Sequence, residues 1–175
     1  MKKQSNLSRL LDYAGKYRVL TYLSWMFSAV SALLALIPFW YIWRVLKEII
    51  EVAPRYENAV HVTQYGWMAV AAAIASVLVY ITGLMCSHLA AFRIATNLRL
   101  SMTNHVAVLP LGVIEQFGSG KLRRIISETA GATETYLAHQ LPDKAKAMAT
   151  IVGLLALLLI FDWRLGLLSL VPVVL

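Results

Sequence analysis

A glycine and a lysine in the sequence FGSGKLRRIISE, residues 117–128, are residue types that bind phosphate in nucleotide-binding loops. Such a loop needs a glycine five residues before its Gly-Lys pair and a Ser or Thr directly after it, whose hydroxyl binds magnesium. Here the pair is Gly120 and Lys121, but Glu115 and Leu122 occupy those two positions. The stretch is therefore not predicted to bind a nucleotide. Lys121 is expected to be a solvated charge, and no residue of the chain is assigned a catalytic role.

Histidine and cysteine do not show the spacing of a metal site. The four histidines, His61, His88, His105 and His139, are scattered over an expected loop, a membrane segment and the ends of long helices. The single cysteine, Cys86, lies inside an apolar run and has no second cysteine as a ligand partner. No metal site is predicted.

Polar side chains inside the apolar segments are candidates for a substrate cavity, because polar groups are costly at membrane depth. Pro142 in LAHQLPD is expected to free a carbonyl near His139 and to kink its helix. Two other interpretations stay open. A hydroxyl can bond back to its own helix, and a Tyr or His near a boundary can lie among the lipid headgroups. The cavity candidates are Tyr80, Ser87, His88, Tyr136, His139 and Gln140.

The composition is that of a membrane protein. Hydrophobic residues make up 59% of the chain, charged residues 14%, and the mean hydropathy is +0.67. The net charge of +7 comes from basic residues that flank apolar segments. This distribution favours a role in membrane orientation, and nucleic acid is not expected as a partner.

The apolar runs predict several membrane helices, since a span needs about 20 apolar residues. Residues 19–43 are predicted as a first span, and residues 5–17 as an amphipathic helix along the interface before it. A further apolar helix is expected to start at 163 and continue to 175. Its roughly eleven apolar residues are too few to cross a bilayer, so the chain is expected to be a part of a longer protein that is not stable alone.

Two further helices extend well beyond the membrane thickness. The apolar stripe predicts a helix over 65–108, roughly 65 Å long, and another over 120–161. Pro110 ends the first, and Ser119 or Gly120 is expected to open the second. A short helix over 111–117 is predicted between them, with the glycines forming the corner. The two long helices thus form a hairpin that projects from the bilayer.

The basic residues predict which side the hairpin faces. With the N-terminus in the cytoplasm, twelve of the 16 Lys and Arg residues lie inside and four outside, a positive-inside bias. The chain is therefore expected to be a multi-pass protein of the plasma membrane with a cytoplasmic N-terminus. The inside residues are Lys2, Lys3, Arg9, Lys16, Arg18, Arg93, Arg99, Lys121, Arg123, Arg124, Lys144 and Lys146, and the outside ones are Arg44, Lys47, Arg55 and Arg164.

The order of these segments resembles the transmembrane domain of ATP-binding cassette exporters of the multidrug and lipid-flippase type. The resemblance covers nearly the whole chain, 1–175, as the N-terminal part of such a domain. Its most specific stretches are LPLGVIEQFGSGKLRRIIS, and FDWRLGLLSLVPV as the external turn into a fourth helix. Two departures are that Val113 and Ile114 stand where members often have aromatics, and that Glu128 is only near the usual position of an aspartate. The implied fold is all-α, a type 1 exporter domain with long transmembrane helices and cytoplasmic extensions.

The resemblance also implies a mechanism. The helix at 111–117 would be a coupling helix that docks on an ATPase domain through Val113, Ile114, Glu115 and Phe117. ATP and magnesium would bind that domain, and the chain itself would bind no cofactor. Further partners would be a second transmembrane domain and membrane lipid. The alternative is a small membrane adaptor whose hairpin binds a partner without ATP-driven transport, and the transported substrate is not predicted.

Overall fold

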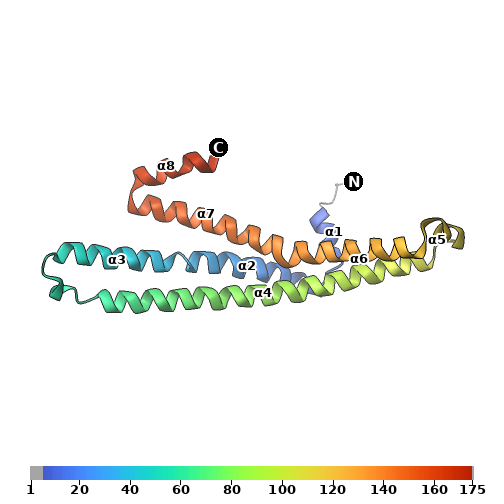
Figure 1. Ribbon diagram of the computed structural model, residues 1–175, viewed down its shortest axis with the longest axis horizontal. Coiled ribbons are helices and arrows are strands. Elements are labelled where there is room, and N and C mark those ends of the chain that lie inside the picture. The colour runs from blue at the N-terminus through green and yellow to red at the C-terminus, as the bar shows by residue number, and fades with distance from the viewer. Residues whose placement is uncertain (1–5, 175) are drawn as a thin grey trace. The chain divides into compact units, whose positions relative to one another are not determined.

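The computed structural model describes residues 6–174, and every secondary-structure element in that range is helical (Figure 1). Lys2, Lys3, Leu175 and the expected helix start at Ser5 lie outside the described residues. By length and composition, three helical stretches can cross a membrane: Gly15–Val52, Val62–Ala107 and Ser119–Phe161. The all-α membrane fold expected from the sequence is confirmed.

The chain divides into two compact units, each formed by segments distant in sequence. The first combines the residues up to 25 with 83–143, and we call it the hairpin unit. The second combines 26–82 with 144–175, and we call it the span unit.

The first apolar segment consists of two helices, α2 (Arg18–Leu34) and α3 (Ile37–Val52), where the sequence predicts one span over 19–43. Pro38 lies in the first turn of α3 and has no N–H to bond the carbonyl four residues earlier, so the helix is interrupted before it. Past residue 43, α3 continues until Ala53, which adopts an extended ψ of 137° directly before a proline.

Aromatic stacking and close helix contact hold the span unit together. The ring of Trp40 on α3 stacks on Phe161 at the end of α7 (Leu141–Phe161), with centroids 5.5 Å apart. Gly153 on α7 lies close to the end of α2 and the turn after it: an added Cβ would come within 2.6 Å of a Leu36 side-chain methyl and 2.7 Å of a Leu33 side-chain methyl. A larger residue here would require these two leucine side chains to shift.

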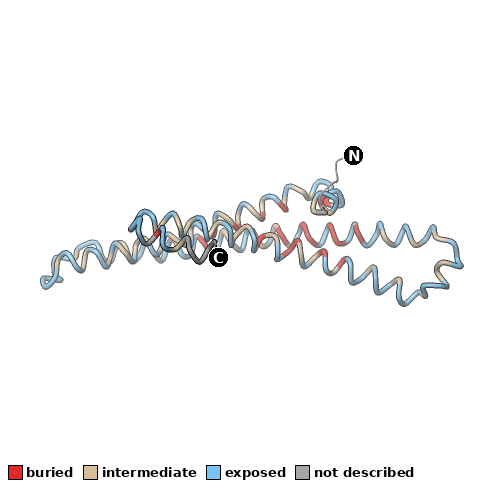
Figure 2. Tube along the Cα trace, turned by 90° about the horizontal axis from the view of Figure 1, so that it is seen from above, coloured by how far each residue is buried: buried red, intermediate tan, exposed pale blue. Residues whose placement is uncertain are grey.

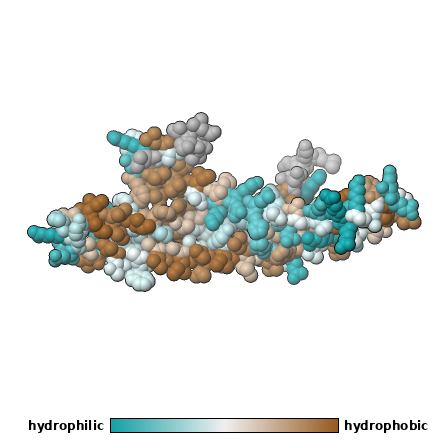
Figure 3. All heavy atoms as spheres, viewed as in Figure 1, coloured by the Kyte–Doolittle hydropathy of each residue, from teal (hydrophilic) through white to brown (hydrophobic). Residues whose placement is uncertain are grey.

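Turns and short helices connect the long helices of the span unit. After η2 (Tyr56–Asn58), the N–H of His61 donates to Glu48 Oε1 at 2.9 Å, which ties the start of α4 to α3. Asp162 Oδ1 accepts from the Arg164 N–H at 2.8 Å and opens α8 (Trp163–Val174). Large apolar side chains remain exposed along α4 and α7, and Figure 3 shows apolar residues gathered over α3 and α7. Such a surface suits contact with lipid.

The hairpin unit contains the end of α4 (Val62–Ala107), then α5 (Leu111–Phe117), α6 (Ser119–Thr135) and η3 (Tyr136–Gln140). The sequence predicts boundaries of 65–108, 111–117 and 120–161 for these helices. The structure differs by a π-helical turn at η3, which divides the third helix into α6 and α7.

Three alanines, with one isoleucine and one leucine, form the core of the hairpin unit, which Figure 2 shows as buried positions along facing helices. The alanines allow α4 and η3 to approach closely, as small residues do between membrane helices. The core residues are Ala14, Ala91, Ile94, Leu137 and Ala138.

The N-terminal segment packs on the same unit. The expected helix over 5–17 ends early, because α1 (Asn6–Asp12) is followed by a turn and η1 (Gly15–Tyr17). Asn97 Nδ2 on α4 donates to the Tyr13 carbonyl at 2.9 Å, and the Arg93 guanidinium lies 5.6 Å from the Tyr17 ring. These contacts attach the segment to α4.

Candidate functional site

The tip of the hairpin carries an exposed apolar patch formed by Val108, Leu111 and Phe117, which we call the tip patch. These side chains are 79%, 69% and 46% exposed. Of the tip residues predicted from the sequence, Glu115 and Phe117 are exposed, whereas Val113 and Ile114 are half-buried. Val108 and Leu111 were missed, although their positions on either side of Pro110, outside both long helices, could have indicated them.

Gly118, not Gly120, forms the corner after α5. Gly118 has φ +76° and ψ 138°, a conformation that favours glycine, and its N–H donates to the Ile114 carbonyl at 2.9 Å. Gly120 has helical geometry within α6. As expected, Ser119 opens α6, but its hydroxyl does not cap the helix, because Gly118 is the N-cap and no side chain bonds the first amides.

Lys121 is in contact with an aromatic ring rather than only solvated. Its Nζ lies 5.4 Å from the centroid of the Phe117 ring. This cation–π contact connects the first turn of α6 to the tip patch. At an exposed site such a contact contributes about 0.5–1 kcal/mol.

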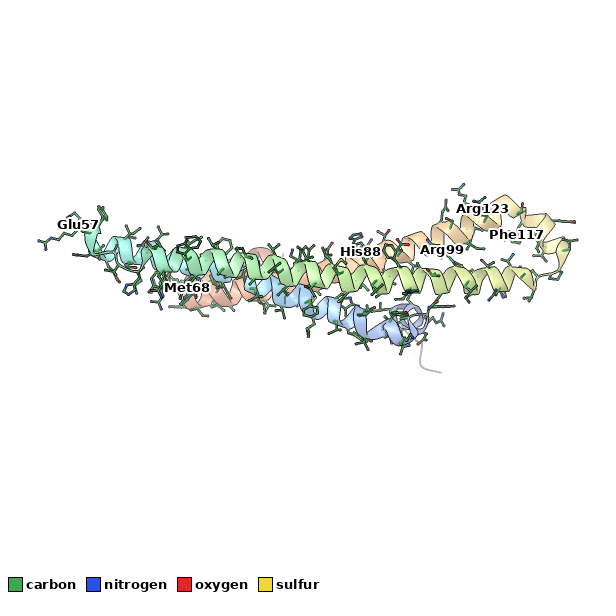
Figure 4. All side chains as sticks on the ribbon, turned by 90° about the horizontal axis from the view of Figure 1, so that it is seen from below. Glu57, Met68, His88, Arg99, Phe117 and Arg123 are labelled. Carbon is green, nitrogen blue, oxygen red and sulfur yellow. The ribbon has the colours of Figure 1, made fainter. Side chains whose placement is uncertain are left out.

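A groove of about 430 Å³ lies between α4, α5 and α6, behind the tip. Its floor is apolar and includes Ile114, so this predicted docking residue points into the hairpin. Arg99 on one wall lies 3.5 Å from Glu134 of α6, an ion pair that joins the two long helices. Figure 4 shows Phe117, Arg123 and Arg99 in this order from the tip along the hairpin. The other lining residues are Thr103, Val106, Ser119, Leu122, Arg123, Ile126 and Ser127.

Ser87, a predicted cavity residue, has a structural partner instead. Its buried hydroxyl lies 2.6 Å from the Ala138 carbonyl and 3.2 Å from the Leu137 carbonyl. In an α-helix Ala138 would accept from residue 142, which is a proline without an N–H. The N–H of Leu141 bonds Tyr136 in the π pattern and so does not serve Leu137. Ser87 therefore donates to the Ala138 carbonyl, which Pro142 leaves without its α-helical donor, and lies within hydrogen-bond distance of the Leu137 carbonyl.

His88 and His139 lie together, although the sequence placed the histidines apart. Their ring centroids are 4.9 Å from each other in an edge-to-face arrangement, one on α4 and one on η3. Within residues 6–174, no group of three or more His, Cys, Asp or Glu side chains could hold a metal ion. Neither the sequence spacing nor the pair alone predicts a metal centre. Figure 4 shows His88 on α4 near η3.

The remaining predicted cavity residues divide between core and surface. Tyr136 is half-buried and packs against the core of the hairpin unit. Gln140, the last residue of η3, is exposed together with His139. These residues therefore do not converge on one enclosed cavity within the hairpin unit.

Tyr80 in the span unit contacts a lysine that the cavity prediction missed. Lys146 Nζ of α7 lies 3.8 Å from the centroid of the Tyr80 ring on α4, and both residues are half-buried. The sequence signal was present, since Lys146 directly precedes the apolar run 147–161. It was instead counted among the residues that orient the chain.

Three hydroxyl groups of the span unit donate to their own helices, which agrees with one of the two open interpretations, whereas the buried hydroxyl of Ser28 has no partner among the described residues. Ser76 Oγ donates to Ala73, Thr82 Oγ1 to Leu78 and Thr150 Oγ1 to Lys146, all main-chain carbonyls at 2.8 to 2.9 Å. They are not prearranged as donors to a substrate.

Comparisons with known proteins match this architecture. Residues 21–175 match the family model described as the ABC transporter transmembrane region. The mycobactin import ATP-binding/permease proteins IrtA of Mycolicibacterium smegmatis and Mycobacterium tuberculosis are each 33% identical to this chain over 86 residues. The matched stretch covers 49% of this chain and 10% of each relative. The chain therefore matches about a tenth of the length of these curated relatives.

Proposed function

The chain belongs to the family of ABC transporter transmembrane regions, and from this premise we propose that it forms part of the membrane pathway of an ATP-driven transporter working by alternating access. The single observation that carries the proposal is the hairpin with an exposed apolar tip. Its first helix, α4, has 46 residues, about 69 Å at 1.5 Å per residue. The hydrocarbon core is only about 30 Å thick, so the helix has length to reach a partner outside it.

In this proposal α5 is the coupling helix that binds an ATPase domain. An apolar patch exposed at the end of a hairpin suits a protein contact, and the exposed ring of Phe117 would supply a large contact area when a partner covers it. The Gly118 corner connects α5 to α6, and the Arg99–Glu134 ion pair joins α6 to α4. A movement of the ATPase domain would thus be transmitted along α4 and α6.

The ATPase domain is proposed as the place where ATP and magnesium bind, because the chain itself has no phosphate loop. The relatives are named as ATP-binding and permease proteins in one chain, which supports an ATPase partner. We further propose a second transmembrane domain as partner and a plasma-membrane location with the N-terminus and α5 in the cytoplasm. The distribution of basic residues supports this orientation.

The direction of transport has two candidates. The exporter-type fold supports export, as the sequence resemblance implies. The printed names of the relatives support import of mycobactin as the second candidate. The two are separated by whether inside-out molecules move the substrate into the liposomes or out of them.

The experiment reconstitutes the complete protein with its ATPase domain in liposomes and measures ATP-dependent movement of mycobactin. ATP is supplied only outside, so that only inside-out molecules are driven. Accumulation inside the liposomes indicates export and depletion indicates import. A non-hydrolysable ATP analogue is the control. Absence of ATP-dependent transport of mycobactin or labelled lipid, with intact binding of a partner by the hairpin, would favour the adaptor alternative.

A further inference from the structure

Lys146 is a cation on the membrane-spanning part of α7 that contacts an aromatic ring. Its Nζ lies 3.8 Å from the centroid of the Tyr80 ring. In the part of the chain that the structure describes, no carboxylate is within the 4.0 Å of an ion pair with Lys146. The positive charge is therefore held by a ring face and not by a counter-charge.

The depth of Lys146 follows from the aromatic end of the same unit. Phe161 stacks there with Trp40, a composition typical of the membrane interface. Lys146 precedes Phe161 by 15 residues on α7, or about 22 Å along the helix. The hydrocarbon core is about 30 Å thick. With Phe161 placed at one boundary, Lys146 lies about 8 Å inside the other, at the edge of the span next to the side where the sequence counts it among the inside residues.

Two threonine hydroxyls of the same helices are already engaged in main-chain bonds, whereas the Lys146 ammonium retains free donors. Thr82 and Thr150, on the same two helices, donate to main-chain carbonyls of their own helices. The ammonium of Lys146 has three N–H donors and keeps donor capacity after contacting the ring. Ionisable groups at membrane depth commonly mark a substrate path.

We propose that Lys146 binds the anionic group, a phosphate or carboxylate, of an amphiphilic molecule whose apolar chain lies against α4 and α7. The Tyr80 ring holds the ammonium while the site is empty and yields it when the anion arrives. The inference rests on the proposed transport function, because it assigns a recognition group to that pathway. The anion is carried either by the transported molecule or by a membrane phospholipid, since both present the same chemistry.

Binding is tested on the complete transporter in nanodiscs of pure phosphatidylcholine, without nucleotide, using radiolabelled dodecyl phosphate. Lys146→Met removes the charge and is expected to weaken binding about tenfold or more, the loss of one charge-assisted hydrogen bond. Lys146→Arg keeps the charge and should stay within about threefold of wild type. Lys144→Met is the matched control, because this exposed lysine is two residues away and faces another side of α7. Its affinity should change less than about twofold.

Tyr80→Leu gives a second measure that does not depend on removing the lysine. The Tyr80 ring competes with the anion for the Lys146 ammonium, so its removal should raise the affinity for dodecyl phosphate about two- to fivefold. Dodecylphosphocholine, which has the same chain and no net charge, should bind weakly to every variant.

A second arm distinguishes the two sources of the anion. Nanodiscs with one fifth phosphatidylglycerol are compared with the pure phosphatidylcholine discs. Competition by this lipid in wild type but not in Lys146→Met identifies a phospholipid as the occupant. Absence of competition identifies the transported amphiphile.

The inference is overturned if Lys146→Met binds dodecyl phosphate like wild type, or if Lys144→Met loses as much affinity. Weaker binding by Tyr80→Leu would overturn the role given to the ring. The assay contains no ATP, so its result is separate from that of the transport function. A wild-type protein that binds dodecyl phosphate but shows no ATP-driven transport would contradict the proposed function alone.

Discussion

The hydroxyl of Ser87 on α4 donates to the main-chain carbonyl of Ala138 in η3 at 2.6 Å. This bond joins two segments 51 residues apart, at the carbonyl that Pro142 leaves without its α-helical donor. In a membrane protein, such carbonyls must be satisfied by neighbouring groups, and Ser and Thr side chains commonly serve. The serine, the proline and the π-helical turn thus form one structural unit.

We predict that Ser87→Ala destabilises the complete transporter by about 1–2 kcal/mol, because the carbonyl of Ala138 loses this hydroxyl donor. Thermal unfolding in detergent measures the effect. Ser76→Ala is the control, since that hydroxyl bonds only its own helix, and a change below about 0.5 kcal/mol is expected.

A double-mutant cycle tests the link with the proline. Pro142→Ala restores an N–H that can donate to the Ala138 carbonyl. Ser87→Ala should therefore lower the free energy of unfolding less in the Pro142→Ala background than in wild type. Equal costs in both backgrounds would show that the hydroxyl does not replace the missing donor.

The tip patch is predicted to couple the membrane domain to an ATPase domain. In the complete transporter, Leu111→Ala combined with Phe117→Ala should leave nucleotide affinity unchanged and reduce transport strongly, about tenfold or more if Phe117 is a hot spot. Lys121→Ala, which removes one exposed cation–π contact, should reduce transport less than about fivefold. Nucleotide binding and uptake are measured in reconstituted vesicles. Loss of nucleotide binding in Lys121→Ala, with the double variant unaffected, would instead support a phosphate loop.

The two glycines at the tip are predicted to respond in opposite ways. Gly118→Ala forces a side chain into a φ of +76° and should destabilise by about 1–3 kcal/mol. Gly120→Ala, in a helix with nothing within 4 Å of the added Cβ, should stabilise by up to about 1 kcal/mol. Thermal unfolding of both variants gives the comparison. Destabilisation by Gly120→Ala would show that the glycine required at the corner is Gly120 and not Gly118.

Orientation is tested by labelling single cysteines in intact cells after Cys86→Ala. A cysteine at Asn58, in η2, should react with a membrane-impermeant thiol reagent, and a cysteine at Ser119 should react only after permeabilisation. This follows from the proposed cytoplasmic position of α5. If the cysteine at Ser119 reacted in intact cells and the cysteine at Asn58 did not, the topology would be opposite to the proposed one.

The sequence by itself determined the fold class and the existence of the long helices. Apolar runs of spanning length and the stripe that continues past Phe92 leave few alternatives to long membrane helices, because a bilayer demands internal satisfaction of the backbone. The failed phosphate-loop pattern at Gly120 was also readable from spacing alone. Local chemistry was sufficient for these conclusions.

Only the tertiary structure decided which polar groups meet. Ser87 and Ala138, His88 and His139, and Tyr80 and Lys146 are each more than 50 residues apart in sequence. Their contacts depend on the rotation and register of α4 against η3 and α7, and a π-helical turn changes that register locally. Helical periodicity shows which residues share one side of a single helix. Which residues of two helices come into contact depends on how the helices pack, and no single segment encodes that packing.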